Sequence, residues 1–254
     1  MSGACVFLVR RFVSVSRLRL NNEIASCYLA IVMGLYGIFS GFIIASLWEQ
    51  QRQAEENVLH EASELRTIFR LAGTLPAPTG PRIQQAAIDY AKAVVDKEWE
   101  LLLRGDDRVN HSHPEKDRIW ESLKSYVERG ELQSPFFEPL LSHFETLSEA
   151  RRSRVYDAQR SLPAYLWMIL IMGSGLSILC TLLLGTENIR LQALLTGLAG
   201  GLVLLMLFVV QDLQNPFQGY WVTTPQAFEL ALDRMSHTGP RDAPSVAPLA
   251  NGGG

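Results

Sequence analysis

Residues 35–50 read LYGIFSGFIIASLWEQ, and this stretch decides the fold. Its first fourteen residues carry no charge, and Glu49 follows directly after Trp48. The uncharged run starts earlier, because residues 24–47 hold 24 consecutive positions without a charged side chain. A helix rises about 1.5 Å per residue, so it needs about 20 apolar residues to cross ~30 Å of hydrocarbon. We therefore predict a transmembrane helix over residues 24–48, with Trp48 in the headgroup layer and Glu49 in water.

Two further runs have the same length and character. Residues 164–184 give 21 uncharged positions, and residues 191–210 give 20. Only GTENIR, residues 185–190, lies between them, and so short a link forces the two helices into an antiparallel hairpin. Buried helices of a soluble protein are the alternative, but three uncharged runs of at least 20 residues strongly favour membrane spans.

Charge is concentrated between the first and second spans. Residues 49–161 contain 16 basic and 20 acidic side chains, whereas the whole 254-residue chain has a net charge of −3. This balance gives no electrostatic basis for binding nucleic acid. The three cysteines, Cys5, Cys27 and Cys180, show neither metal-ligand nor disulfide spacing. The sequence has no glycine-rich phosphate loop and no GxSxG motif, so we expect neither a cofactor nor an enzyme.

The charged segment is predicted to be a helical insert. One apolar stripe recurs at steps of 4, 4, 3, 4 and 3, and it consists of Ala54, Val58, Ala62, Leu65, Phe69 and Ala72. Neither glycine nor proline interrupts residues 42–72, so the first span should continue into this helix as a stalk. Further helices are expected over residues 82–103, 114–128 and 136–160. The predicted fold class is therefore an all-α membrane protein with three full transmembrane helices and a helical-bundle insert over residues 49–161.

The two ends of the chain differ from the spans. Residues 1–23 hold an apolar run of only seven residues before Arg10, too few for a span, and we interpret them as a short basic, interfacial helix. Residues 211–235 contain two prolines that interrupt a regular helix, and they carry an aromatic cluster expected at the membrane interface: Phe217, Tyr220 and Trp221. Residues 236–254, rich in proline, glycine and alanine, are expected to be disordered.

Two local motifs raise the possibility of a metal site and of acid–base catalysis, but we favour simpler interpretations of both. The HSH motif at residues 111–113 follows two aspartates at residues 106–107. Two histidine ligands on a loop make a weak metal site, so a solvated turn is favoured and no metal is expected. Trp99 lies between two glutamates, residues 98 and 100. General acid–base catalysis would need a pocket and a partner, so we favour a tryptophan that anchors the core or an interface, flanked by solvated glutamates.

Charged side chains near the predicted membrane surface have two interpretations each. The acids on the stalk either form its wet face or line a charged vestibule that tunes ion access. The arginines before the second span either contact lipid headgroups, which is favoured, or form an anion-attracting rim. The vestibule candidates are Glu49, Glu55, Glu56, Arg151, Arg152 and Arg154.

Small residues at a spacing of four indicate close helix contacts in lipid. The candidates are Gly37 and Gly41 in the first span and Gly197 and Gly201 in the third, with a further pair at Gly173 and Ser177. Packing within the chain is favoured, and contacts between subunits are the alternative. Arginines do not fix the orientation, because six lie near the membrane on the insert side and five on the other.

Several segments together resemble one family. They are NNEIASCYLAIVMGLYGIFSGFIIASLWEQ, HEASEL, DYAKAVVDKEW, RRSRV, LPAYLW and NPFQGYW, in this order along the chain. The chain resembles the bacterial bestrophin-like domain proteins of unknown function over roughly residues 9–232. Bestrophins proper are pentameric anion channels with a hydrophobic neck, so the resemblance implies a multi-pass protein of the bacterial inner membrane whose insert is cytoplasmic.

The resemblance also implies which side chains would form the neck. Residues 34–36, GLY, and Trp48 are similar to the bestrophin step of glycine, an aromatic residue and tyrosine, followed by a tryptophan at the exit. On this basis the neck candidates are Cys27, Ile31, Leu35, Phe39 and Phe42. A ring of such apolar side chains could gate by dewetting, whereas ordinary contacts with lipid or neighbouring helices are the alternative.

Two departures from the bestrophin pattern affect what can be carried over. Calcium-gated bestrophins have a run of acids after the Asn-Pro-Phe-Gly segment, whereas this chain has residues 220–223, YWVT, and one extra residue, Gln218, before Gly219. No calcium clasp is therefore expected. Bestrophins also have four spans, and here the first is reduced to residues 3–9.

The predicted function is a homo-oligomeric channel for small inorganic ions, and the resemblance implies that it is pentameric and conducts anions. The alternative is a membrane-anchored sensor or scaffold whose helical insert binds a partner protein. A membrane enzyme ranks third, because the sequence shows no catalytic constellation.

Overall fold

The computed structural model describes residues 22–110, 113–129, 134–183 and 188–238. Helices connected by short irregular segments make up these residues, and no strand occurs among them. The expected all-α class is thereby confirmed. The interpretations of residues 1–21 and 239–254 lie outside the described part of the chain.

Helix α3 (Asn22–Ala72) is one uninterrupted helix of 51 residues. The first predicted span therefore does continue into the predicted stalk, as expected for a segment without glycine or proline after residue 41. All six residues of the predicted stalk stripe, from Ala54 to Ala72, are buried. The steps of three and four residues thus identified the packed face of the stalk correctly.

The helix expected over residues 82–103 is built from three pieces. Helix α4 (Thr79–Ala93) passes into a π-helical turn, η1 (Val94–Glu98), and then into α5 (Trp99–Arg104). The π-helical turn adds one residue to the helical repeat and was not predicted. Gly105 ends α5 in the left-handed conformation, with φ of 65°, as helix C-termini often do.

The next two helices match their predicted ranges. A short 3₁₀ turn, η2 (Asp107–Asn110), precedes α6 (Pro114–Glu128), which starts with proline in its first turn. Helix α7 (Phe137–Gln159) follows, and it is one residue shorter at each end than the predicted range of residues 136–160.

The last three helices include one that was not predicted. Helices α8 (Ala164–Leu183) and α9 (Ile189–Leu213) correspond to the second and third predicted spans. Helix α10 (Gln226–Thr238) begins directly after Pro225 and includes residues 236–238, which had been assigned to a disordered tail. Pro225 ends the irregular aromatic segment and suits the start of a helix. We predicted that this irregular segment extends to residue 235, beyond the point where α10 begins.

The chain divides into two compact units. The first comprises Met1–Gln51, Arg160–Asn215 and Gly219–Trp221, and the second comprises Arg52–Gln159, Pro216–Gln218 and Val222–Gly254. Helix α3 contributes its first part to the first unit and its stalk to the second.

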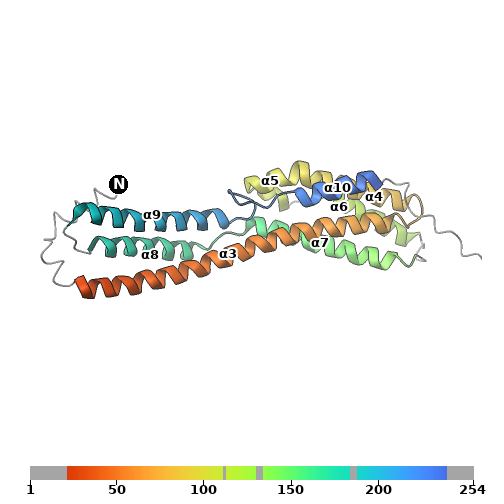
Figure 1. Ribbon diagram of the computed structural model, residues 1–254. Helices are drawn as coiled ribbons and strands as arrows, with labels where there is room; N and C mark the ends of the chain where they lie inside the picture. Colours follow the sequence, from red (N-terminus) through yellow and green to blue (C-terminus); the bar gives the residue numbers. More distant parts are fainter. Residues whose placement is uncertain (1–21, 111–112, 130–133, 184–187, 239–254) are drawn as a thin grey trace, which may run out of the picture. The chain divides into compact units, whose positions relative to one another are not determined.

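The first unit contains three apolar helices, the start of α3 together with α8 and α9, which run side by side (Figure 1). Three helical stretches, Ser26–Ala72, Phe137–Leu182 and Ile189–Leu213, are long and apolar enough to cross a membrane. Only 11, 22 and 17 % of their apolar windows are buried within the chain. Surfaces this apolar and this exposed are expected to face lipid or another subunit rather than water.

The second unit is a helical bundle with its own core. The stalk of α3 packs with α4, α6, α7 and α10 around fully buried residues such as Ile68, Ile83 and Leu140. Trp99 is buried and lies edge-on to Phe217, with their ring centroids 5.6 Å apart. The core position expected for Trp99 is confirmed, whereas Glu98, which was expected to be solvated, is buried. Phe217, which had been expected at the membrane interface, is instead fully buried in this unit.

Candidate functional site

One face of α3 in the first unit is apolar and exposed, and none of the described residues of that unit covers it. Its large side chains recur at steps of 3, 4, 3 and 4, and they are Tyr28, Ile31, Leu35, Ile38 and Phe42. Their exposed fractions lie between 53 % for Ile31 and 73 % for Phe42. We call these five residues the α3 stripe. Because it runs along most of the apolar part of the helix, a surface of this kind needs lipid or another subunit to cover it.

The α3 stripe and the predicted neck overlap but are not identical. Ile31, Leu35 and Phe42 belong to both sets, and Cys27 is also exposed. Phe39 is half-buried and packs against the core of the first unit, so it lies on a different face. Tyr28 and Ile38 were missed, although steps of three and four from Leu35 would have found Ile38.

The opposite face of α3 is fixed against α8 by a tyrosine. The Tyr36 hydroxyl donates a hydrogen bond to the carbonyl oxygen of Leu170 (3.2 Å) and lies 2.6 Å from the hydroxyl oxygen of Ser174. A Cβ atom added to Gly173 would lie 2.5 Å from the Tyr36 ring, so the ring covers a position where only glycine fits. These contacts set the rotation of α3 about its axis, and that rotation turns the α3 stripe away from α8.

The contact between Tyr36 and Gly173 leads to a testable prediction. Gly173→Ala is expected to destabilise the first unit by about 1–3 kcal/mol, because the methyl group must displace the aromatic ring. The matched control is Gly175→Ala on the same helix, where an added Cβ meets nothing within 4 Å. Thermal unfolding in detergent should show a lower midpoint for the first variant only. Equal midpoints would contradict the close contact.

The other small residues differ in their packing, and Ser177, the partner of Gly173 in its pair, is buried. An added Cβ at Gly37, Gly41 or Gly201 would meet no atom within 4 Å. Gly197 is half-buried. Packing within the chain, the favoured interpretation, therefore has no support at the first three glycines. A contact between subunits at these positions stays a prediction.

The vestibule candidates divide into exposed and buried residues. Four of them, Glu49, Glu55, Glu56 and Arg152, are exposed, and Glu56 forms an ion pair with Arg52 one turn away on α3. The buried ones are Arg151 and Arg154. Both interpretations of these two arginines placed them at a surface, and this placement has to be corrected.

Arg154 is the centre of a buried ion network in the second unit. It projects from α7 and is fully buried. Its Nε and Nη2 atoms donate to the two carboxylate oxygens of Glu61 on α3, at 2.6 and 3.1 Å. Nη2 also donates to Glu98 at 2.7 Å, and the guanidinium carbon lies 5.8 Å from the centre of the Phe228 ring on α10. One side chain thus links four of the packed segments.

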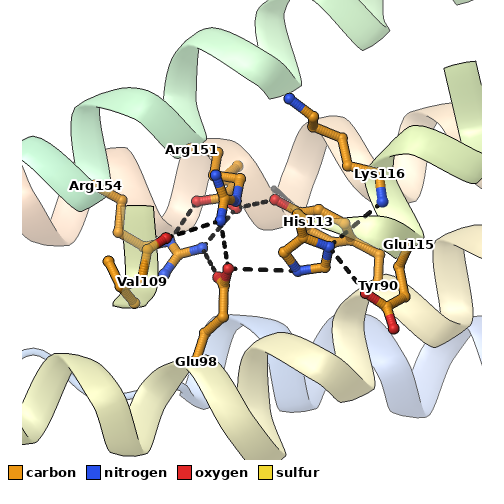
Figure 2. A network of polar contacts seen from close by, with 9 residues as sticks. Tyr90, Glu98, Val109, His113, Glu115, Lys116, Arg151 and Arg154 are labelled. Atoms are coloured by element: carbon orange, nitrogen blue, oxygen red, sulfur yellow. Dashed lines mark hydrogen bonds and ion pairs between the residues drawn. The ribbon is translucent and has the colours of Figure 1, made fainter. Parts of the chain in front are cut away.

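Glu98 joins the remaining members of the network (Figure 2). Its carboxylate accepts a hydrogen bond from Arg151 Nη2 at 2.5 Å, and it lies 3.6 Å from His113 Nε2. Arg151 also donates to the carbonyl oxygen of Val109 at 3.2 Å. Glu98 is the last residue of the π-helical turn η1. π-helical turns occur frequently at functional sites. This one ends at Glu98, whose side chain is buried in the second unit.

The charges of the network are balanced and shift the ionisation of its members. Burial alone would lower the pKa of Arg154, but Glu61 and Glu98 raise it well above its ordinary value. Burial would raise the pKa of Glu98, but Arg154 and Arg151 hold it below its usual range. Burial and the carboxylate of Glu61 raise the pKa of Tyr90, whose hydroxyl donates to Glu61 at 2.5 Å. Arg154 and Glu98 therefore stay charged, and Tyr90 stays protonated.

His113 completes the network as the N-cap of α6. Its Nδ1 atom accepts the backbone N–H of Lys116 at 3.4 Å, and its ring stacks on Tyr90 with centroids 4.4 Å apart. Burial lowers the pKa of His113, with Arg151 and Arg154 adding to the effect and Glu98 and Glu115 opposing it. The solvated turn that we favoured for this motif is therefore wrong at His113. His111 lies outside the described residues, and no group of three metal-binding side chains occurs among those described.

The lowered pKa of His113 predicts a pH dependence. The folded chain binds this proton less readily than the unfolded chain, so the contribution of His113 is complete above about pH 6.5 and decreases as the pH falls towards the folded pKa. We expect the unfolding midpoint of the second unit to fall between pH 7.5 and pH 5.5. His113→Asn keeps an N-cap acceptor but cannot titrate, so its midpoint should change less over this range. Identical pH profiles of the two proteins would contradict this role of His113.

We missed the network in the sequence because we treated charged residues as surface residues, even where they lie at helical spacing from apolar ones. Glu61 lies three residues after Val58 and four before Leu65, which places it on the buried stripe of the stalk. Arg154 lies four residues before Ala158 and seven after Leu147, both buried. A charge within a stripe at helical spacing was the available signal. No sequence signal pointed to Glu98, because the π-helical turn changes its direction.

With this geometry described, comparisons with known proteins identify the family. A family model, the bestrophin-like domain, matches residues 1–228, and the chain belongs to this family. No curated protein sequence matches the chain significantly.

Solved structures show the same fold. A bacterial bestrophin homolog from Klebsiella pneumoniae aligns with a TM-score of 0.66 and 15 % identity, covering 89 % of this chain and 99 % of that chain. A single-residue variant of a Klebsiella pneumoniae homolog gives a TM-score of 0.68 at 13 % identity, covering 92 and 97 %. A crystal structure described as a membrane protein gives 0.66 at 16 % identity, covering 89 and 100 %. At these identities the similarity establishes the fold.

Proposed function

We propose that the chain forms a homo-oligomeric ion channel in a bacterial inner membrane, with the α3 stripe lining an apolar neck. Bestrophins proper, which the sequence resembles, are pentameric anion channels. We therefore propose a pentamer that conducts small anions such as chloride, with the second unit in the cytoplasm.

The observation that carries the proposal is the α3 stripe itself. Three of its residues, Ile31, Leu35 and Phe42, coincide with neck positions implied by the family resemblance, and all are more than half exposed. A ring of such side chains around a symmetry axis would form a constriction that excludes water when narrow and conducts when wider. The same surface could also face lipid, so the proposal requires the α3 helices of several subunits to surround one axis.

Small residues beside the stripe support association of subunits. Gly34, Gly37 and Gly41 lie on the exposed side of α3, and an added Cβ at any of them would meet nothing within 4 Å. Glycines at such spacing allow the backbones of neighbouring helices to approach closely in lipid. We propose that the adjacent subunit packs here, which leaves the larger side chains of the stripe free to face the axis.

The exposed charges near the end of the first span are proposed to line the entrance. Glu49, Glu55 and Glu56 on α3 and Arg152 on α7 are exposed, and charged rings at a pore mouth change the local concentration of ions. Acids favour cations and arginine favours anions, so the two kinds of side chain at this rim act on ion selectivity in opposite directions.

The test combines subunit counting with ion flux. We expect the detergent-purified protein to form a closed ring with α3 around its axis, and proteoliposomes loaded with chloride to release it faster than protein-free vesicles. A monomer or dimer without a central axis, and without flux, would contradict the channel. That result would favour the alternative, a membrane-anchored sensor or scaffold.

A further inference from the structure

The segment that follows α9 is held by a buried carboxylate. Asp212 lies in the last turn of α9 and is 8 % exposed. Its Oδ1 atom accepts the backbone N–H of Tyr220 at 2.7 Å, and its Oδ2 atom accepts the backbone N–H of Trp221 at 3.1 Å. Hydrogen bonds to an ionised carboxylate are stronger than those between neutral groups. One side chain therefore fixes the backbone of two residues that are eight and nine positions further along the chain.

A glycine makes this arrangement possible. Gly219 has φ of 127°, a conformation that other residues rarely adopt. A Cβ atom added there would lie 2.6 Å from Asp212 Oδ1 and 3.1 Å from the Asp212 carbonyl oxygen. The backbone of Gly219 thus passes directly over the carboxylate. We call Asp212 and Gly219, with the two N–H groups that Asp212 binds, the Asp212 clamp.

The clamp leaves two aromatic side chains of the first unit exposed. Tyr220 is 82 % exposed and Trp221 is 44 % exposed, and their rings meet edge-on with centroids 6.0 Å apart. Exposing two large aromatic rings to water does not stabilise the fold, so water alone does not explain why the turn is ordered in this way. Tyrosine and tryptophan do gain from a boundary where one part of the ring is apolar and the other hydrated.

The same end of the first unit carries further exposed aromatic residues. Trp48 on α3 is exposed, and so is Tyr165 in the first turn of α8. These positions lie at one end because Leu47, Leu170 and Leu213 pack in one cluster. Tyr28, also exposed, lies 20 residues before Trp48, a distance of ~30 Å along a helix, the thickness of the hydrocarbon layer. Tyr220 and Trp221 therefore join Trp48 and Tyr165 in a group of exposed aromatic rings at one boundary of this layer.

We propose that the Asp212 clamp presents Tyr220 and Trp221 as a preformed anchor in the headgroup layer of a phospholipid bilayer. The anchor rests on the membrane location in the proposed function but not on ion conduction. It fixes the depth of the C-terminal end of α9 in the bilayer, while residues 219–221 themselves stay outside the hydrocarbon. A second copy of the chain covering these rings is the competing occupant.

Fluorescence quenching in vesicles tests the anchor. Variants that retain a single tryptophan, Trp221, Trp48 or Trp120, with the others changed to phenylalanine, are placed in phosphatidylcholine–phosphatidylglycerol vesicles. Lipids brominated near the headgroup, lipids brominated near the bilayer centre and aqueous iodide serve as quenchers. We expect Trp221 to be quenched at least about twofold more by the shallow than by the deep bromines, as Trp48 should be. Trp120 in the second unit, 47 % exposed and so matched to Trp221, should respond to iodide alone.

Removing the clamp should affect Trp221 alone. In the Trp221-only protein, Asp212→Ala or Gly219→Ala should reduce quenching by shallow bromines and increase quenching by iodide. The same substitutions in the Trp48-only protein should leave the bromine quenching unchanged, which shows that the first unit still folds. The anchor is overturned if Trp221 responds as Trp120 does, or if neither quencher reaches Trp221, which would indicate a second copy. Failure of the bromines to quench Trp48 would overturn the membrane location as well.

Discussion

Arg154→Met should destabilise the second unit by about 3–5 kcal/mol, the usual effect of removing one partner from a buried ion pair. Methionine fills much of the same space, so the main loss is electrostatic. Glu61 would lose both of its bonds to the guanidinium group, and Glu98 would lose one of its two arginine partners. Melting followed by circular dichroism in detergent should show a midpoint lower by roughly 10–20 °C.

Arg152→Met is the control for this prediction. Arg152 lies two residues away on the same helix and carries the same charge, but it is exposed. Its replacement should change the stability by no more than about 0.5 kcal/mol. Similar losses in the two variants would mean that the net charge of α7 matters rather than the buried network. A melting midpoint of Arg154→Met equal to that of the original protein would contradict the network itself.

Leu35→Ala should increase the rate of chloride release from proteoliposomes by about tenfold, which corresponds to a barrier lower by ~1.4 kcal/mol. In the proposed oligomer every subunit contributes one Leu35 to the neck. Shortening all these side chains at once widens the apolar ring and makes it easier for water to fill.

Leu198→Ala on α9 is the matched control. Leu198 is 63 % exposed and Leu35 is 65 % exposed, so both variants remove the same apolar surface from a membrane-spanning helix. Only Leu35 belongs to the α3 stripe. Equal rates in the two variants, or a faster rate for Leu198→Ala alone, would contradict a neck formed by α3.

Much of the fold was predictable because it follows from two periodic signals. Uncharged runs of at least 20 residues predicted the three membrane-spanning helices, and steps of three and four residues predicted the buried face of the stalk. Both signals are properties of a single helix, so they do not depend on which helix packs against which. The ranges of α6 and α7 followed for the same reason from proline, charge and apolar spacing.

The parts that were missed depend on contacts between helices. Arg154 and Glu61 lie 93 residues apart in the sequence, and each looks like a surface charge until the other is placed beside it. The π-helical turn at Val94–Glu98 changes the direction of Glu98 by inserting one residue, which no period reveals. Helix α10 was missed because an aromatic, proline-containing segment before it was taken to extend further than Pro225.

The candidate site was predicted in part. Spacing and resemblance gave Ile31, Leu35 and Phe42, which the structure places on one exposed face of α3. Phe39 was assigned to the same face because steps of four drift around a helix with 3.6 residues per turn. The direction of the stripe is set by Tyr36 and Gly173, a contact between two helices that the sequence alone does not show.

Modification of a single thiol at position 35 tests the central claim most directly. Cys5, Cys27 and Cys180 are changed to serine, and Leu35→Cys or Leu198→Cys is then introduced into this background. A charged, membrane-impermeant methanethiosulfonate is added to both sides of chloride-loaded proteoliposomes. If α3 lines a water-accessible neck, the reagent should abolish most of the flux through the Leu35→Cys protein and leave the flux through the Leu198→Cys protein unchanged. Undiminished flux through the Leu35→Cys protein after addition of the reagent, or equal loss in both, would contradict a pore lined by this helix.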